Sequence, residues 1–157
     1  MLKISKERSV NISLGLSCLF FIIIIAGAVV MPTLSEMLIG AKDSIGNRDL
    51  ITEAGKIYVL VLAYLALADL FLINSLLLNL LLRVKKHLVF TEKSISLIRG
   101  ISWAAIFFAL IFVGLGVYFQ LAFIVAFAVL FLALSIRVVK NVIEEATAIK
   151  AENDLTV

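Results

Sequence analysis

The sequence has little of three residue types from which many functional sites are built. It contains one cysteine, one histidine and one proline among 157 residues, and these are Cys18, His87 and Pro32. A single cysteine excludes an internal disulfide, and one cysteine with one histidine excludes a metal site built from several soft ligands. We expect Cys18, which lies in an apolar run, to be an inert small hydrophobic residue. With one proline, the chain also lacks the proline-broken spans of many transporters.

Charged residues are scarce as well. They make up 16% of the chain and apolar residues 63%, whereas soluble domains average about 25% charged and about half apolar residues. A soluble core cannot bury this apolar excess, so the composition predicts an integral membrane protein whose main partner is the lipid bilayer. The formal net charge of +3 is too small to favour direct binding of nucleic acid.

Four apolar stretches approach the roughly 20 residues that a helix needs to cross the hydrocarbon core of a membrane. Their approximate bounds are 11–31, 57–82, 101–118 and 120–138. Only GLGVYFQ separates the last two, with Gly114, Gly116 and Gln120 as the break. A tight helical hairpin is therefore expected in preference to one long tilted helix. Since no repeat or second domain is visible, residues 1–157 are predicted to form a single all-α domain, an integral membrane four-helix bundle.

The distribution of Lys and Arg predicts how the chain is threaded. Of the 14 Lys and Arg residues, three lie between the first and second spans, and the others lie before the first span, between the second and third, or after the fourth. Because cytoplasmic loops are enriched in Lys and Arg, both termini are predicted to be cytoplasmic. The basic start followed by AGA at residues 26–28 also resembles a cleavable leader, but the apolar run continues to Leu34, which favours a retained span.

The second apolar stretch contains an aspartate, Asp69, deep in its sequence. A central aspartate opposes insertion by roughly 3 kcal/mol, which the surrounding Leu, Ile, Val and Phe residues outweigh. On a helix, Tyr58, Asp69 and Arg83 fall within about 40° of one another, Asn79 lies about 80° from Asp69, and Asn74 lies about 140° away. We expect Tyr58, Asp69, Asn79 and Arg83 to form a polar stripe, with Asp69 facing the bundle and Asn74 as a separate intramembrane candidate.

Two interpretations of Asp69 stay open. It is a protonatable switch or part of an ion pathway, or it is a hydrogen-bonded aspartate that fixes helix packing and contributes on the order of 1 kcal/mol. Its partners must come from water or from other spans, which offer hydroxyls such as those of Ser13, Ser17, Ser102 and Ser135. No second intramembrane carboxylate completes an aspartyl-protease pair, so we expect neither an enzyme nor a cofactor or metal site.

The cytoplasmic segments hold the other candidates. Thr91 is expected to be the N-cap of a helix that begins in FTEKSISLIRGIS and runs into the third span. Beyond the fourth span, residues 139–157 are expected to continue as a helical tail with one apolar face. That face would be covered by the membrane surface, by another protein, or by the protein's own inner loop. In the last case Arg99 or Lys93 would meet Asp154 or Glu152.

Two stretches on this side carry a family resemblance. They are HLVFTEKSISLIRGIS, with Phe90, Leu97 and Arg99, and AIKAENDLTV, with Glu152, Asn153, Asp154, Leu155, Thr156 and Val157. Both resemble a widespread bacterial family of small four-span membrane proteins of unknown function. Members commonly have a glycine shortly before the phenylalanine, where this chain has His87. They are commonly encoded beside very small helix-turn-helix regulators of the Cro/repressor type. The resemblance thus implies a multi-pass protein of the bacterial plasma membrane that influences a DNA-binding partner.

Three kinds of function fit these features. The first is a non-enzymatic regulatory or sensory membrane protein that binds a cytoplasmic DNA-binding regulator through residues 83–100 and the tail. The second is a small transporter or channel component, which could be a homo-oligomer, using Asp69 as a coupling or pore residue. The third is a structural subunit of a membrane complex. We favour the first, because the charged and exposed segments are predicted to be cytoplasmic.

Overall fold

The computed structural model describes residues 6–40 and 53–155, which fold into four long α-helices. They are α1 (Lys6–Gly40), α2 (Glu53–Lys85), α3 (Glu92–Gly116) and α4 (Leu121–Leu155). The described residues contain no strand, so the predicted all-α four-helix bundle is confirmed. All four helices have the length and mean hydropathy of membrane-spanning helices.

The helices extend beyond the apolar stretches that predict them. α1 and α4 each contain 35 residues, which corresponds to about 50 Å, whereas the hydrocarbon core of a membrane is about 30 Å thick. α4 continues as a helix past its predicted span, from Val138 to Leu155. Lys42 and Arg48, which contribute to the predicted threading, lie outside the described residues.

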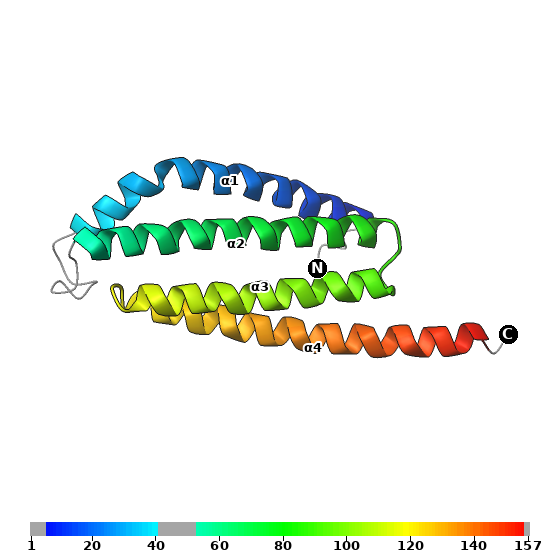
Figure 1. Cartoon of the computed structure of the whole chain (residues 1–157). Coiled ribbons are helices and arrows are strands. Elements are labelled where there is room, and N and C mark those ends of the chain that lie inside the picture. Colours follow the sequence, from blue (N-terminus) through cyan, green and yellow to red (C-terminus); the bar gives the residue numbers. More distant parts are fainter. Residues whose placement is uncertain (1–5, 41–52, 156–157) are drawn as a thin grey trace, which may run out of the picture.

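Successive helices run antiparallel, and each packs mainly on its neighbours in the chain (Figure 1). Extensive contacts join α1 to α2, α2 to α3, and α3 to α4. One end of the bundle holds the start of α1, the α2–α3 connection and the last turns of α4 (Figure 1). We call it the basic end, because Arg83, Lys85, Lys86 and Lys93 lie there.

The tight hairpin predicted from GLGVYFQ is present between α3 and α4. α3 ends at Gly116 and α4 begins at Leu121. A Cβ atom at Gly116 would lie 2.7 Å from the ring of Phe123, so a larger residue there would displace that ring. Farther along the pair, Ser102 Oγ donates a 3.1 Å hydrogen bond to the carbonyl oxygen of Ala133, which is fully buried. Small side chains therefore let the two helices approach closely.

Many large apolar side chains point away from the bundle. On the outer helices Ile22, Val29, Phe127 and Phe131 have exposed fractions of 65%, 77%, 74% and 64%. Helices that are apolar on all sides are typical of membrane spans, in which lipid takes the place of a protein core. The most buried helix is α3, which packs on both α2 and α4.

The chain leaves the C-terminus of α2 through a histidine in the left-handed conformation, a position where glycine is common. The N–H of His87 bonds to the Val84 carbonyl at 3.1 Å, and the N–H of Leu88 bonds to the Arg83 carbonyl at 2.9 Å, which is the Schellman arrangement. Its left-handed position is His87, with a φ of 58°. Glycine adopts this conformation without a steric penalty, whereas a side chain at this position is strained.

Candidate functional site

The polar residues of α2 lie on two different faces of the helix. On the α1 face, Asn74 and Ser17 are buried, with exposed fractions of 6% and 2%. Ser17 Oγ donates to Asn74 Oδ1 at 2.9 Å, and Asn74 Nδ2 donates to the Ser17 carbonyl oxygen at 2.9 Å. These two hydrogen bonds connect α1 to α2. Asn74 therefore has a packing partner, and it lies apart from the Asp69 side of the helix, as its register predicts.

Asp69 lies on the face of α2 that meets α3. Leu62 contacts the Gly114 position of α3, and Leu76 contacts the Gly100 position. Asp69 is midway between the two leucines, so it lies at the level of residues 107 and 108, midway between the two glycines. Ala66, one turn from Asp69, belongs to the same buried apolar cluster as Phe108. The carboxyl group is thus placed in the middle of the helix pair, beside apolar side chains.

The carboxyl group of Asp69 forms no hydrogen bond with another described residue. Its side chain has an exposed fraction of 5%, and Oδ2 is buried with no partner among residues 6–40 and 53–155. The four hydroxyls expected as partners all bond elsewhere. Their acceptors are the Ser9 carbonyl for Ser13, Asn74 for Ser17, the Ala133 carbonyl for Ser102 and the Phe131 carbonyl for Ser135. The described contacts therefore include no hydrogen bond through which Asp69 would fix helix packing.

The other members of the polar stripe are more exposed than Asp69. Tyr58 has an exposed fraction of 44%, and its ring centroid lies 5.5 Å from that of Tyr118. Asn79 is exposed and donates to the Ser75 carbonyl within α2 at 3.0 Å. Of the predicted stripe, the bundle buries only Asp69. Among the described residues, no group of three or more His, Cys, Asp and Glu side chains is arranged to hold a metal.

The α2–α3 connection at the basic end is held by one arginine. Arg83 Nε donates to Ser94 Oγ at 3.1 Å, and Arg83 Nη2 donates to Thr91 Oγ1 at 3.1 Å. Thr91 is the N-cap of α3, as predicted, since its Oγ1 accepts the Ser94 N–H at 3.4 Å. Ser94 Oγ also donates to the Leu88 carbonyl at 2.7 Å. The guanidinium group thus links the end of α2 to the start of α3.

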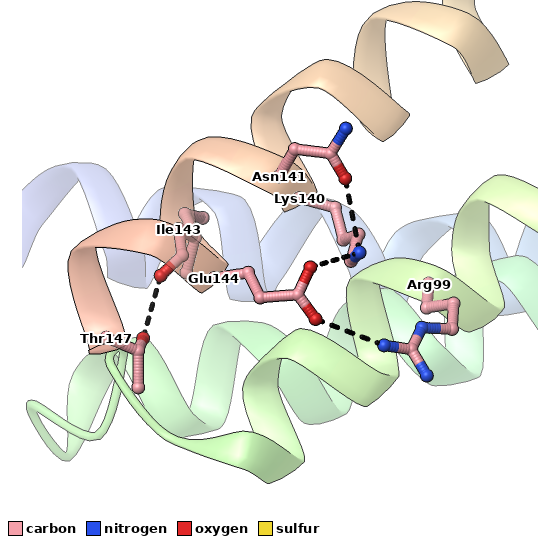
Figure 2. A network of polar contacts seen from close by, with 6 residues as sticks. All are labelled: Arg99, Lys140, Asn141, Ile143, Glu144 and Thr147. Atoms are coloured by element: carbon pink, nitrogen blue, oxygen red, sulfur yellow. Dashed lines mark hydrogen bonds and ion pairs between the residues drawn. The ribbon is translucent and has the colours of Figure 1, made fainter. Parts of the chain in front are cut away.

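A second polar network joins α3 to α4 (Figure 2). Glu144 forms an ion pair with Arg99 at 3.3 Å and another with Lys140, one helical turn earlier. The hydrogen bond from Lys140 lowers the pKa of the Glu144 carboxyl below its ordinary value, and the charges of Lys140 and Arg99 lower it further. The described partner of Arg99 is thus Glu144 instead of Glu152 or Asp154. The antiparallel register of the hairpin is the signal that could have identified Glu144.

The partner-binding candidates are divided between the connection and the tail. Phe90 has an exposed fraction of 48%. Leu97 lines a cavity at the basic end. Glu152 and Asn153 are exposed on the last turns of α4. Asp154 and Leu155 belong to the helix, but their side chains lie outside the described residues, as do Thr156 and Val157 entirely. The structure therefore presents the two predicted motifs at one end of the bundle.

Four long apolar helices, with outward-facing aliphatic and aromatic side chains, define the class as a multi-pass α-helical membrane protein. Residues 28–157 match the family described as protein of unknown function (DUF2975), and the chain belongs to that family. The match covers α2, α3, α4 and the part of α1 from Ala28 to Gly40. Comparisons with curated proteins and with solved structures give no match for this chain.

Proposed function

We propose that this protein is a non-enzymatic regulatory or sensory membrane protein that docks a small cytoplasmic DNA-binding regulator at its basic end. The observation that carries the proposal is the projection of α4. Past its ion pairs with α3 at Glu144, the helix continues to Leu155, a length of about 16 Å. Figure 1 shows these turns extending beyond the α2–α3 connection. The end of α4 is thus available to a partner that approaches the membrane.

The end of α4, from Val142 onward, has an apolar strip that the bundle leaves exposed. Val142 and Ile149 are seven residues apart and lie on one side of the helix, with exposed fractions of 61% and 53%. Ile143 and Ala146, on a neighbouring side, are half-buried. The bundle therefore covers only part of the apolar face, and an amphipathic helix of this kind suits an apolar groove in a partner protein.

Charge supports a protein partner. Glu145 and Glu152 flank the apolar strip and are exposed, and these carboxylates make the tail a poor match for an anionic membrane surface. A small DNA-binding protein carries basic residues, which would complement them. The resemblance of AIKAENDLTV and HLVFTEKSISLIRGIS to a family with helix-turn-helix neighbours supports the same kind of partner.

The test is whether the full-length protein in nanodiscs captures a small helix-turn-helix protein of the Cro/repressor type. We expect direct binding, and a loss on the order of tenfold or more on changing Val142→Asn together with Ile149→Asn. Deletion of residues 151–157 should also weaken capture. The matched control is Lys150→Gln, next to Ile149 on the same exposed turn.

Three outcomes would contradict the proposal. They are an absence of binding by the unaltered protein, full capture by the Val142 and Ile149 variant, and equal weakening by Lys150→Gln. Thermal unfolding of each variant in the same nanodiscs distinguishes lost docking from lost folding. A truncated tail that destabilises the bundle yet leaves capture intact would show that it packs on its own protein.

A second candidate function rests on Asp69. Its carboxyl group is buried at the centre of the α2–α3 pair without a hydrogen-bond partner among the described residues, and ionisable groups in such positions commonly serve ion or proton pathways. In a transporter or channel component, Asp69→Asn would abolish pH-dependent flux into proteoliposomes while the protein stays folded. Unchanged flux in that variant would exclude Asp69 as a coupling residue.

A further inference from the structure

A cavity of about 500 Å³ lies at the basic end, between the last turns of α2 and the first turns of α3. Three cationic side chains line it, Arg83, Lys86 and Lys93, and no carboxylate does. Leu82 and Leu97 form apolar parts of its wall. This volume is in the range of sites that bind small molecules. The lining combines positive charge with aliphatic surface.

No carboxylate among the described residues neutralises the positive charge of the cavity. The described partners of the Arg83 side chain are the neutral hydroxyls of Thr91 and Ser94. Within residues 6–40 and 53–155, no ion pair involves Arg83, Lys86 or Lys93. The Arg83 guanidinium is also fixed in place, while Nη1 keeps its N–H groups for another acceptor. Several cations held together without carboxylates favour an anion.

The cavity is at the depth where a membrane-spanning helix meets lipid headgroups. Arg83 directly follows the apolar stretch 57–82 of α2. On α3, Trp103 has an exposed fraction of 57%. The Cζ atom of Arg137 lies over the Trp103 ring, 5.0 Å from the ring centroid. Exposed tryptophans and arginines of this kind are typical of the membrane interface. Trp103 is about 10 Å along α3 from Ser96, another lining residue of the cavity.

We propose that this cavity binds the phosphate headgroup of an anionic phospholipid from the surrounding leaflet. Lipid is favoured over a soluble phosphate because Leu82 and Leu88, which line the cavity, have exposed fractions of 41% and 43% and can contact the glycerol and upper acyl chain. Basic pockets between spans are known sites for such headgroups. If the termini are cytoplasmic, as the Lys and Arg distribution predicts, the lipid belongs to the inner leaflet, where anionic lipids are enriched.

The test is native mass spectrometry of the full-length protein released from nanodiscs of phosphatidylcholine that contain phosphatidylglycerol. The unaltered protein should bind phosphatidylglycerol on the order of tenfold more tightly than phosphatidylcholine. Lys86→Gln combined with Lys93→Gln should lose this preference. Arg83 is left unchanged, because its removal would also break the α2–α3 connection. The matched control, Lys85→Gln with Lys150→Gln, removes the same charge from exposed positions outside the cavity and should keep the preference.

The proposal is overturned if the unaltered protein does not prefer phosphatidylglycerol, or if both double variants lose the preference equally, which would indicate a general effect of net charge. Inorganic phosphate at millimolar concentration should not displace the lipid, and displacement would assign the cavity to a soluble phosphate. Capture of the DNA-binding regulator depends on Val142 and Ile149, which do not line the cavity. Failure of either proposal can therefore be recognised separately.

Discussion

The two faces of α2 each bury a polar side chain, but the two side chains differ in their hydrogen bonding. On the α1 face, Asn74 is joined to Ser17 by two hydrogen bonds. On the α3 face, five residues earlier in the sequence, Asp69 is equally buried and has no partner among the described residues. Since both side chains cost free energy to place in a membrane, the comparison separates a polar group that stabilises packing from one that packing does not explain.

Asn74→Ala should produce the largest change in stability. It removes both hydrogen bonds to Ser17 and leaves the Ser17 hydroxyl without its described acceptor, so we expect a loss of about 1–2 kcal/mol. The measurement is unfolding of the purified protein in mixed micelles of a mild detergent and sodium dodecyl sulfate. A double-mutant cycle with Ser17→Ala should show a favourable coupling energy, and additive losses would contradict the assigned pair.

At the end of the same helix, His87→Gly should have a smaller effect of opposite sign. The left-handed φ of 58° is strained for a histidine and accessible to glycine. We expect a gain of about 0.5–1 kcal/mol in the same unfolding assay. His87→Ala is the control, because it removes the imidazole and keeps the Cβ atom. An equal gain with alanine would assign the effect to the imidazole ring instead of the backbone.

Asp69→Asn should change stability least of these three substitutions, by about 0.5 kcal/mol or less, because no described hydrogen bond is lost. The side chain keeps its size, so the apolar cluster that contains Ala66 and Phe108 stays filled. The comparison with Asn74→Ala, in the same micelles, is the measurement. A loss as large as that of Asn74→Ala would show that Asp69 is also a packing residue, and the contrast between the two faces would fail.

Local features of the bundle could be predicted from the sequence with good accuracy. The hairpin at GLGVYFQ, the N-cap at Thr91 and the helical tail each depend on residues close together in the chain, and each is present. Pairings between helices were harder to predict. The sequence suggests Ser17 as one of four hydroxyl partners for Asp69, whereas the Ser17 hydroxyl bonds to Asn74. The rotation and axial register of two packed helices decide such pairs, and both depend on the whole interface.

The ion pair of Arg99 illustrates the same limit at the basic end. Charge alone permits Arg99 to meet Glu152 or Asp154 as well as Glu144. The choice depends on the axial register of α4 against α3. Close contacts deeper in the hairpin, such as the hydrogen bond from Ser102 to Ala133, fix this register. α4 thus meets α3 at Glu144. The cavity at the basic end also depends on the register of two helices, because the end of α2 and the start of α3 create it together. It could therefore not be predicted from the sequence.

The smallest predicted effect concerns this α3–α4 contact. Because Lys140 and Arg99 lower the pKa of Glu144 in the folded protein, its ion pairs stabilise the contact at pH values above the carboxyl's ordinary pKa of 4.5. The stabilisation is lost as the pH falls through the lowered folded-state pKa. Hydrogen exchange in the last turns of α4 should therefore be faster at acid pH, after correction for intrinsic exchange rates.

The matched variant, Glu144→Gln, should show faster exchange already at neutral pH and no further change on acidification. Glu145→Gln is the control, since it removes the neighbouring carboxylate, which takes no part in the two ion pairs of Glu144. Because Glu144 is exposed, solvent screens its interactions, and we expect local loosening of the tail without a measurable shift in global unfolding. The same acid response in Glu144→Gln would mean that other groups hold α4 on α3. The tail would then depend on its half-buried residues Ile143 and Ala146, and its freedom to dock a partner would be independent of pH.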